Sequence, residues 1–301
     1  MKENVKRSPL FYVGDKYKLI SEIKTHFPKK IDNFVEPFVG GGSVFMNVEA
    51  NNFILNDIDT NVIALHRHLS VQANNVDLFF NNIWRIIEKY GLSCSYLYDI
   101  VPDDLKLQFP KTYFAKYNKD KYSQLRTDYN NSDRTDITIL YLLLIYGFNR
   151  MLRFNSKGDF NLPVGNVDFN LNTVNALNSY FEEICKKSPN WFNLNFRTFL
   201  SQLQLSKSDL VYLDPPYLIT FSEYNKLWNE DTESELLDLL DNISKKDVKF
   251  AISNVTHYKG RTNDIFIEWA KKYHTYSIKS NYISYHDNTI KSFNEVLVTN
   301  Y

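Results

Sequence analysis

The chain has 301 residues, with 35 basic and 35 acidic side chains and 44% hydrophobic residues. A chain of this length can fold as one large domain or as one domain that carries an insertion. Its zero formal charge argues against a general polyanion binder, so a nucleic-acid partner would have to contact locally clustered basic residues.

Cysteine usage and the N-terminal residues predict a cytoplasmic protein. Cys94 and Cys185 are the only cysteines and form no CxxC pair, so neither a disulfide framework nor a zinc–cysteine site is expected. His66 and His68 are two positions apart on a predicted helix and do not share a face, so no metal is expected there either. Residues 1–7 lack the apolar core of a secretory signal. The chain contains no apolar run of the roughly 18 residues that a membrane span needs, so no membrane partner is expected.

The first part of the chain alternates between short apolar runs and helical patterns. In chain order this predicts a strand at 32–35, a glycine-rich loop at 37–43, a helix opening over 44–50, a strand at 52–55 and a helix from Thr60 to Leu69. Thr60 is expected to cap that last helix. The pattern is typical of a nucleotide-binding strand–loop–helix unit.

Residues 71–204 have a different character. They are rich in Tyr, Asn, Lys and Asp, and the run from Thr138 to Tyr146 is a strongly apolar helix candidate. Between Lys111 and Arg126, lysines alternate with aromatic residues, which fits a solvated helix face as well as it fits a DNA contact. We therefore predict an inserted, mainly helical domain.

The alternation resumes from residue 205. It predicts strands at 210–213, 249–253 and 295–299, with a capping box at Thr232–Glu235 before the intervening helix. Strands alternating with helices predict a doubly wound α/β sheet, built from residues 1–70 and 205–301 around the insertion.

The most informative motif is Asp214-Pro215-Pro216-Tyr217, directly after the apolar strand at 210–213. Proline fixes its own φ, lacks an N–H and keeps the preceding residue extended. The motif thus offers hydrogen-bond acceptors beside a flat aromatic face, which suits the exocyclic amino group of a planar base. The alternative is a proline turn that closes a strand, with Tyr217 in the core.

The loop Glu36-Pro37-Phe38-Val39-Gly40-Gly41-Gly42-Ser43 predicts a nucleotide site. Glycine lets a backbone approach a ligand closely, and Asp57 after the next strand could accept ribose hydroxyls. Phe45 stands where a dinucleotide fingerprint needs its third glycine, which disfavours NAD. A purely structural tight turn is the alternative.

In this order, the two motifs resemble those of the alpha-group amino-directed DNA methyltransferases. Over nearly the whole chain the sequence resembles the Dam-like, D12-class adenine-N6 methyltransferases. The further segments that carry this resemblance are 12–17, 56–59, 148–155 with 158–165, and 294–301. Two departures are Tyr12, where the family often has Trp, and residues 218–225, which match only loosely a family loop that contacts DNA near the target base.

The resemblance implies a Rossmann-like methyltransferase sheet whose insertion, 71–204, recognises the DNA target. It implies S-adenosyl-L-methionine as cofactor, bound by Tyr12, Lys16, Phe38, Gly40, Gly42, Asp57 and Asp214. It also implies catalysis by Asp214, Pro215 and Tyr217. Asp214 and the Pro215 carbonyl would each accept one N–H of the target amine, and Tyr217 would stack on the flipped base.

The resemblance further implies a DNA-reading hairpin in double-stranded DNA, at GATC or a related short site. Its candidate residues are Asn149, Arg150, Arg153, Asn155 and Lys157. Arg153 is the leading base reader because arginine can donate twice to guanine, although a phosphate contact is the alternative. Cytosine N4, an RNA base and a non-catalytic DNA-binding role remain open alternatives. A partner restriction endonuclease is compatible with this sequence, as is either a monomer or a dimer.

Overall fold

The computed structural model describes residues 5–220, 228–278 and 294–301. Its strands form one sheet in the order β3-β2-β1-β4-β5-β8-β7, and β6 pairs with β5. The strands are β1 (Asn33–Glu36), β2 (Asn52–Asn56), β3 (Asn190–Phe192), β4 (Leu210–Leu213), β5 (Lys249–Tyr258), β6 (Arg261–Thr262), β7 (His274–Ile278) and β8 (Asn294–Thr299).

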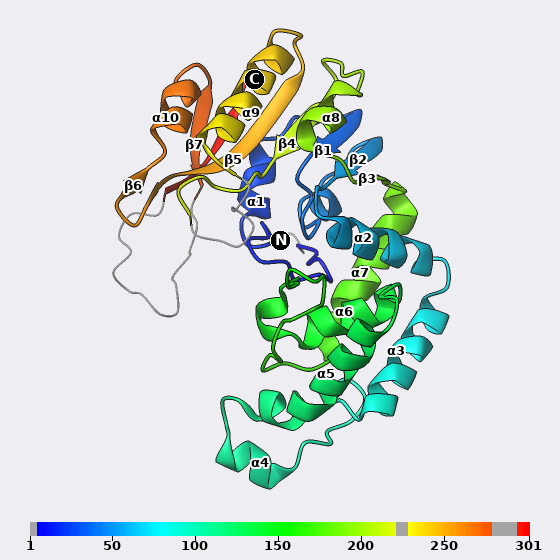
Figure 1. The fold of residues 1–301 in the computed structure, drawn as a ribbon. Helices are drawn as coiled ribbons and strands as arrows, with labels where there is room; N and C mark the ends of the chain where they lie inside the picture. Colours follow the sequence, from blue (N-terminus) through cyan, green and yellow to red (C-terminus); the bar gives the residue numbers. More distant parts are fainter. Residues whose placement is uncertain (1–4, 221–227, 279–293) are drawn as a thin grey trace.

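Helices flank the sheet and form a second group beside it (Figure 1). They are α1 (Ile20–Ile23), α2 (Thr60–Gln72), α3 (Val76–Tyr90), α4 (Asp103–Gln108), α5 (Tyr113–Asn131), α6 (Ile137–Tyr146), α7 (Leu171–Lys187), α8 (Phe196–Ser201), α9 (Glu230–Ser244) and α10 (Asp264–Ala270). Short 3₁₀ turns are η1 (Lys24–His26), η2 (Phe45–Asn47) and η3 (Phe148–Arg150). None of the helices in the described ranges is long and apolar enough to cross a bilayer.

The sheet is mostly parallel, which confirms the predicted doubly wound α/β class. β1 pairs in parallel with both β2 and β4, and β4 pairs in parallel with β5. β8 lies antiparallel between β5 and β7. The strand order reverses between β1 and β4, and ligands of open α/β sheets bind at such a switch point, beyond the carboxyl ends of the strands. The segments that follow β1 and β4 therefore meet at one edge.

Alternate residues of the central strands enter two different cores. Leu210 and Tyr212 of β4 belong to one buried cluster, whereas Val211 and Leu213 belong to the other. Because strand side chains alternate between faces, a strand that is covered on both sides reads as a continuous apolar run. This double burial explains the unbroken sequence Leu210-Val211-Tyr212-Leu213.

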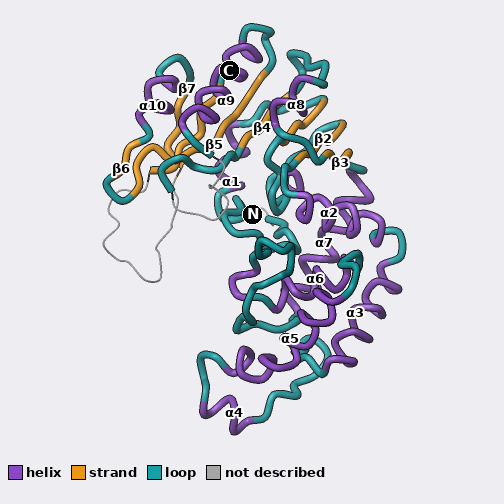
Figure 2. The backbone as a smooth tube through the Cα atoms, in the orientation of Figure 1, coloured by secondary structure: helices purple, strands orange, loops and turns teal. Residues whose placement is uncertain are grey.

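The second group, α3–α7, lies below the sheet in Figures 1 and 2, with α4 farthest from it. α6 is apolar on all sides and buried at its centre, as the run at 138–146 predicted. β3 falls within the range 71–204 but pairs with β2 in the sheet. The helices that lie outside the sheet layer therefore end with α7, before residue 190.

Three local predictions were wrong in detail. The helix expected over 44–50 is only the turn η2, because the chain becomes extended at Val48; the Phe45 carbonyl accepts the Val48 N–H, and the Phe45 and Met46 carbonyls also accept from Lys187. Asp59, not Thr60, caps α2 through its side chain. α9 begins at Glu230, capped by Asn229, so the proposed capping box is not formed and Glu235 pairs with Arg197.

Candidate active site

One cavity of about 420 Å³ opens at the carboxyl ends of β1, β2 and β4. Ligand sites of small molecules typically measure about 300–1,000 Å³. The cavity is lined by every residue that the sequence predicted for catalysis or for cofactor binding: Tyr12, Lys16, Phe38, Gly40, Gly42, Asp57, Asp214, Pro215 and Tyr217. Segments from the N-terminus and from both halves of the sheet thus converge.

The glycine loop follows β1 and passes close beneath Tyr12. Gly40 and Gly42 have φ values of +47° and +79°, which only glycine adopts without strain. A Cβ at Gly41 would lie 2.7 Å from Cβ of Tyr12, which is too close for two non-bonded carbon atoms. The glycines therefore permit both the turn and the approach of the aromatic ring.

Asp57 fixes this loop from the end of β2. One carboxylate oxygen accepts the Gly40 N–H at 2.9 Å, and the other accepts the Asp59 N–H at 2.9 Å. Burial raises the pKa of Asp57 to about 6, although these backbone bonds oppose the shift. The carboxylate is in place to accept hydroxyl groups in the cavity as well as to shape its wall.

Asp214 belongs to a compact network of charged groups. Its Oδ2 lies 2.7 Å from the Lys16 ammonium, and its Oδ1 lies 2.8 Å from the Tyr217 hydroxyl. Glu295 of β8 joins them, at 3.5 Å from the ammonium and 3.1 Å from the hydroxyl. Burial and the nearby Asp214 raise the pKa of Glu295, whereas Lys16 lowers it. The network holds Asp214 at the cavity wall in one orientation.

Glu36 is a second buried acid that the sequence analysis did not select. It is the last residue of β1, it is 2% exposed, and it lines the cavity. Its Oε2 atom has no hydrogen-bond partner within the described structure. Burial, reinforced by Asp214, raises the pKa of Glu36 well above its usual range. Its position directly before Pro37, at the carboxyl end of a parallel strand, was the signal that could have identified it.

An aromatic wall closes another side of the cavity. Phe38 packs 5.5 Å from Phe196 and 5.7 Å from Trp228, measured between ring centroids. The Trp228 indole N–H donates to buried Glu233 at 2.5 Å, which fixes its plane. Only Phe38 was predicted; Phe196 and Trp228 come from distant segments that carry no local motif.

The sequence model for "D12 class N6 adenine-specific DNA methyltransferase" matches residues 12–283. The chain belongs to this family. It is 36% identical over 304 residues to the type II methyltransferase M.FokI of Planomicrobium okeanokoites, covering 98% of this chain and 43% of that protein. It is 33% identical over 310 residues to the modification methylase StsI of Streptococcus sanguinis, with the same coverages of 98% and 43%.

A shorter relative aligns over most of both chains. The DNA adenine methylase of Salmonella typhi is 29% identical over 268 residues, covering 84% of this chain and 82% of that protein. By contrast, this chain spans less than half the length of M.FokI and StsI. The family assignment fits the mixed, mostly parallel sheet described above.

The hairpin expected to read DNA in this D12-class protein lies apart from the cavity. It is closed by bridges between Phe154 and Phe160 and between Gly147 and Val164. The Arg153 Nε–H donates to Oδ1 of Asn161 at 2.9 Å, and Nη2 donates to the Asn161 carbonyl at 2.8 Å. These two bonds use two of the five N–H donors of the guanidinium. The remaining donors, on Nη1 and Nη2, are not bonded to Asn161.

The other predicted hairpin residues have different environments. Asn155 and Lys157 are exposed in the turn, where Asn155 Oδ1 accepts the backbone N–H groups of Lys157 and Asp159. Asn149 is exposed and left-handed, with φ of 54°. Arg150 instead stacks on Phe11, 3.7 Å from the ring centroid, and burial lowers its pKa to about 10.

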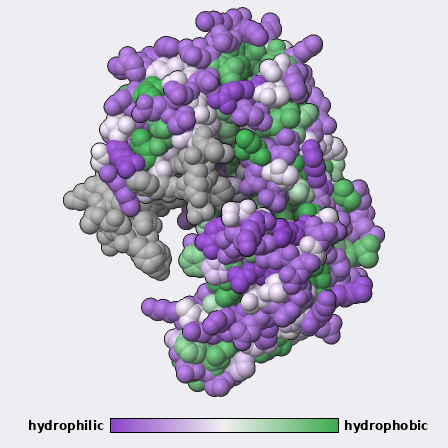
Figure 3. Space-filling view, in the orientation of Figure 1, coloured by the Kyte–Doolittle hydropathy of each residue, from purple (hydrophilic) through white to green (hydrophobic). Residues whose placement is uncertain are grey.

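Figure 3 shows that the helical part presents mainly hydrophilic residues on this side of the molecule. Residues 221–225 of the loosely matching loop lie outside the described ranges. Within the described ranges, no group of three or more His, Cys, Asp or Glu side chains is placed to hold a metal ion.

Proposed function

We propose that this protein transfers a methyl group from S-adenosylmethionine to N6 of adenine in double-stranded DNA. The observation that carries the proposal is the shared cavity: Asp214 and Pro215 face the same space as the glycine loop and Asp57. An acceptor pair for an amino group thus stands beside a nucleotide-type site. Membership of the D12 class supports adenine as the base.

The lining residues fit the parts of this cofactor. The wall of Phe38, Phe196 and Trp228 suits a flat adenine ring, and Asp57 suits ribose hydroxyls. The unpartnered oxygen of Glu36 suits a cationic ammonium group. Lys16 already contacts Asp214, Glu295 and the Gly14 carbonyl, so a contact with the cofactor carboxylate requires its Nζ to give up one of these partners.

When bound, the cofactor supplies an electrophilic methyl group on a sulfonium. The protein's task is to make the amino nitrogen of the base a better nucleophile. Asp214 and the Pro215 carbonyl accept its two N–H groups, which favours a tetrahedral nitrogen with its lone pair aimed at the methyl carbon. Each carboxylate oxygen of Asp214 has a second lone pair, so it accepts the amine while it holds Lys16 and Tyr217.

Tyr217 supports the base from the side. Its hydroxyl is held by Asp214 and Glu295, and the Lys16 ammonium lies 5.2 Å from its ring centroid. We expect the ring held in this way to stack on an extruded base. After transfer, the methylated nitrogen carries a surplus proton, which we expect Asp214 to accept because its carboxylate is the more basic of the two proposed acceptors. With S-adenosylmethionine bound, transfer would be a direct displacement in which the thioether leaves as the amine attacks, so no covalent enzyme intermediate would be needed.

The proposed DNA site is GATC or a related short sequence, read by Arg153 and its neighbours. A restriction–modification role, with an endonuclease acting on the same site, is supported by the relatives M.FokI and StsI. Genomic DNA sequenced from cells that express the protein, with detection of modified bases, tests the site directly. Methylation confined to an unrelated sequence would contradict the GATC proposal.

The activity is tested with labelled cofactor and unmethylated duplex DNA, digested to nucleosides. The expected product is N6-methyladenosine in its deoxy form. Asp214→Ala should lower the rate by about 100- to 1,000-fold or more, the effect typical of removing a preorganised electrostatic group. Asp104→Ala, on the exposed face of α4, is the matched control. Label in cytosine or in RNA alone, or full activity of Asp214→Ala, would overturn the proposal.

A further inference from the structure

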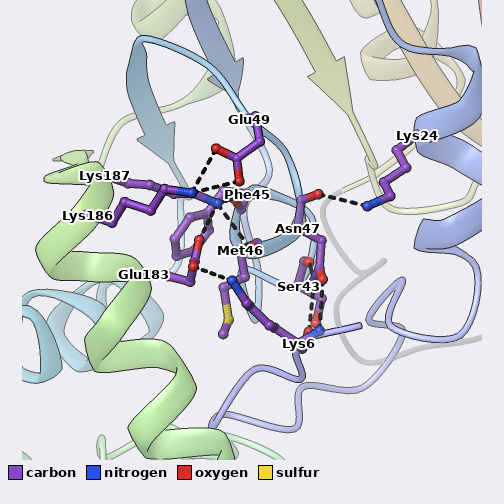
Figure 4. Close-up of polar contacts among 10 residues, drawn as sticks. All are labelled: Lys6, Lys24, Ser43, Phe45, Met46, Asn47, Glu49, Glu183, Lys186 and Lys187. Carbon is purple, nitrogen blue, oxygen red and sulfur yellow. Dashed lines mark hydrogen bonds and ion pairs between the residues drawn. The ribbon is translucent and has the colours of Figure 1, made fainter. Parts of the chain in front are cut away.

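One face of α7 points at the glycine loop rather than at the other helices of its group. Tyr180, Glu183 and Lys187 are three and four positions apart, which places them on the same side of the helix. All three are buried, at 0%, 3% and 8% exposure. Their polar ends reach elements of the sheet-containing part, as Figure 4 shows for Glu183 and Lys187.

Lys187 holds the turn η2, which directly follows the loop. Its ammonium donates to the Phe45 carbonyl at 2.9 Å and to the Met46 carbonyl at 3.0 Å (Figure 4). Glu183 lies 2.5 Å away and balances the charge. Burying an ammonium is unfavourable unless partners of this kind compensate for the lost hydration. We therefore expect the fold to depend on these contacts of Lys187. The two carbonyls belong to η2, directly after the loop.

His66 links Gly40, in the middle of the loop, to the same helix. Its Nε2 lies 2.8 Å from the Gly40 carbonyl, and its Nδ1 lies 2.8 Å from the Tyr180 hydroxyl. A carbonyl only accepts, so Nε2 carries the proton and Nδ1 accepts from Tyr180. The Tyr180 hydroxyl therefore selects the tautomer that can bind Gly40. The imidazole is also stacked on Trp191, with centroids 4.4 Å apart.

The N-terminal segment is tied to the same helix face. Glu183 pairs with the Lys6 ammonium, and the Lys6 backbone exchanges two hydrogen bonds with the Asn47 side chain. Ser8 donates to the Gly41 carbonyl. The segment then continues to Tyr12, which lies over the loop. The N-terminal segment is thus bound to α7 directly, through Lys6 and Glu183, and the glycine loop is bound to it through His66.

We propose that α7 positions the glycine loop for the cofactor through two relays, Tyr180–His66 to Gly40 and Glu183–Lys187 to Phe45 and Met46. These four side chains are absent from the residues that line the cavity in the described structure, so they are positioning residues. The inference rests on the proposed function, because it takes the loop to be the cofactor site. It makes cofactor affinity depend on a helix of the inserted group.

The test compares Tyr180→Phe and Lys187→Met with matched controls that leave both relays intact. Tyr146→Phe removes a buried hydroxyl that donates to the Ser93 carbonyl, and Lys186→Met removes an exposed ion pair with Glu49. Calorimetric titration with S-adenosylmethionine should show about fivefold weaker binding for Tyr180→Phe, as expected for one lost hydrogen bond. Lys187→Met should weaken it about tenfold or more, since bonds to a charged group are stronger.

Steady-state kinetics separate positioning from a general structural effect. The KM for the cofactor should rise by the same factors, with kcat and duplex DNA affinity within about twofold of the controls. Lys187→Arg, which keeps a cation with several donors, should recover most of the affinity. If Lys187→Met fails to fold, as judged by thermal unfolding, the volume-conserving Tyr180→Phe decides the matter.

Cofactor affinity of Tyr180→Phe and of folded Lys187→Met equal to that of the controls would overturn the inference. Asp57→Ala distinguishes this failure from failure of the proposed function. If Asp57→Ala weakens cofactor binding while the α7 variants do not, the site stands and the relays are refuted. If the unaltered protein binds no S-adenosylmethionine, the proposed function itself fails, and the relays fail with it.

Discussion

Replacing Lys16 by Met is the sharpest test of the charged network around Asp214. The substitution keeps the length of the apolar stem and removes only the ammonium. Lys16 is 4% exposed and Glu295 1%, whereas Asp214 is 20% exposed. Without the cation, two carboxylates share one tyrosine hydroxyl as their common partner.

Removing one member of a buried ion pair typically costs about 3–5 kcal/mol. Asp214 keeps some contact with solvent, so the lower end of that range, about 3 kcal/mol at pH 8, is the expected loss. The loss should shrink at lower pH. Burial and Asp214 already raise the pKa of Glu295, and removal of the ammonium raises it further, so protonation of Glu295 on acidification relieves the repulsion.

Urea unfolding of Lys16→Met, Glu295→Gln and the double variant, at pH 8 and pH 5.5, gives the coupling between the two residues. Glu295→Gln should lower the free energy of unfolding much less than Lys16→Met does. The double variant should lose less free energy of unfolding than the sum of the losses of the two single variants. Lys186→Met, from the exposed pair with Glu49, is the control and should change stability little. A loss for Lys16→Met no larger than the control, or strict additivity at both pH values, would refute the argument.

Three further outcomes are expected. Asp57→Ala should weaken S-adenosylmethionine binding in a calorimetric titration, since it removes the ribose acceptor and the bond that holds Gly40; unchanged affinity would remove its role. Arg153→Ala should lower discrimination against substituted DNA sites by about 1–3 kcal/mol in competition binding, whereas uniform weakening on all sequences would indicate a phosphate contact. Burial lowers the pKa of His66 to about 4, so the contribution of His66 to stability should fall as pH decreases from about 6.5 to 4, by roughly 3 kcal/mol. Asp57, whose pKa is raised to about 6, acts in the opposite direction over this range, so the test is the difference between the urea-unfolding free energies of the unaltered protein and His66→Gln. That difference should decrease on acidification, and a difference independent of pH would show that His66 does not titrate there.

The parallel sheet and the two motifs at its edge were predictable because their signals are local. A strand covered on both faces is an unbroken apolar run, and its polar residues gather where the run ends, as Asp57 and Asp214 do. β3 has three residues and half-exposed side chains, so its sequence carries no comparable pattern. The sequence alone therefore does not distinguish β3 from the rest of the range 71–204 in which it lies.

Other features depend on residues that are distant in sequence. η2 ends where the chain becomes extended at Val48, and its Phe45 and Met46 carbonyls bond Lys187, far along the chain. The aromatic wall needs Phe196 and Trp228 beside Phe38, and nothing local marks either one. Likewise, the contact of Arg150 with Phe11 depends on the N-terminal segment and has no local signal; its predicted contact with DNA stays a prediction.

The path of the chain bears on the proposed link between the inserted helices and the glycine loop. The helical group leaves the sheet after α2 and returns through α7 to β3, at the edge beyond β2 (Figure 1). β1 and β4 therefore pair directly, with no strand of the insertion between them. The return helix is the element that holds Gly40, through His66, and Phe45, through Lys187. A displacement of α7 would therefore act on Gly40 and Phe45 together, and on the inference above its expected effect is on cofactor affinity.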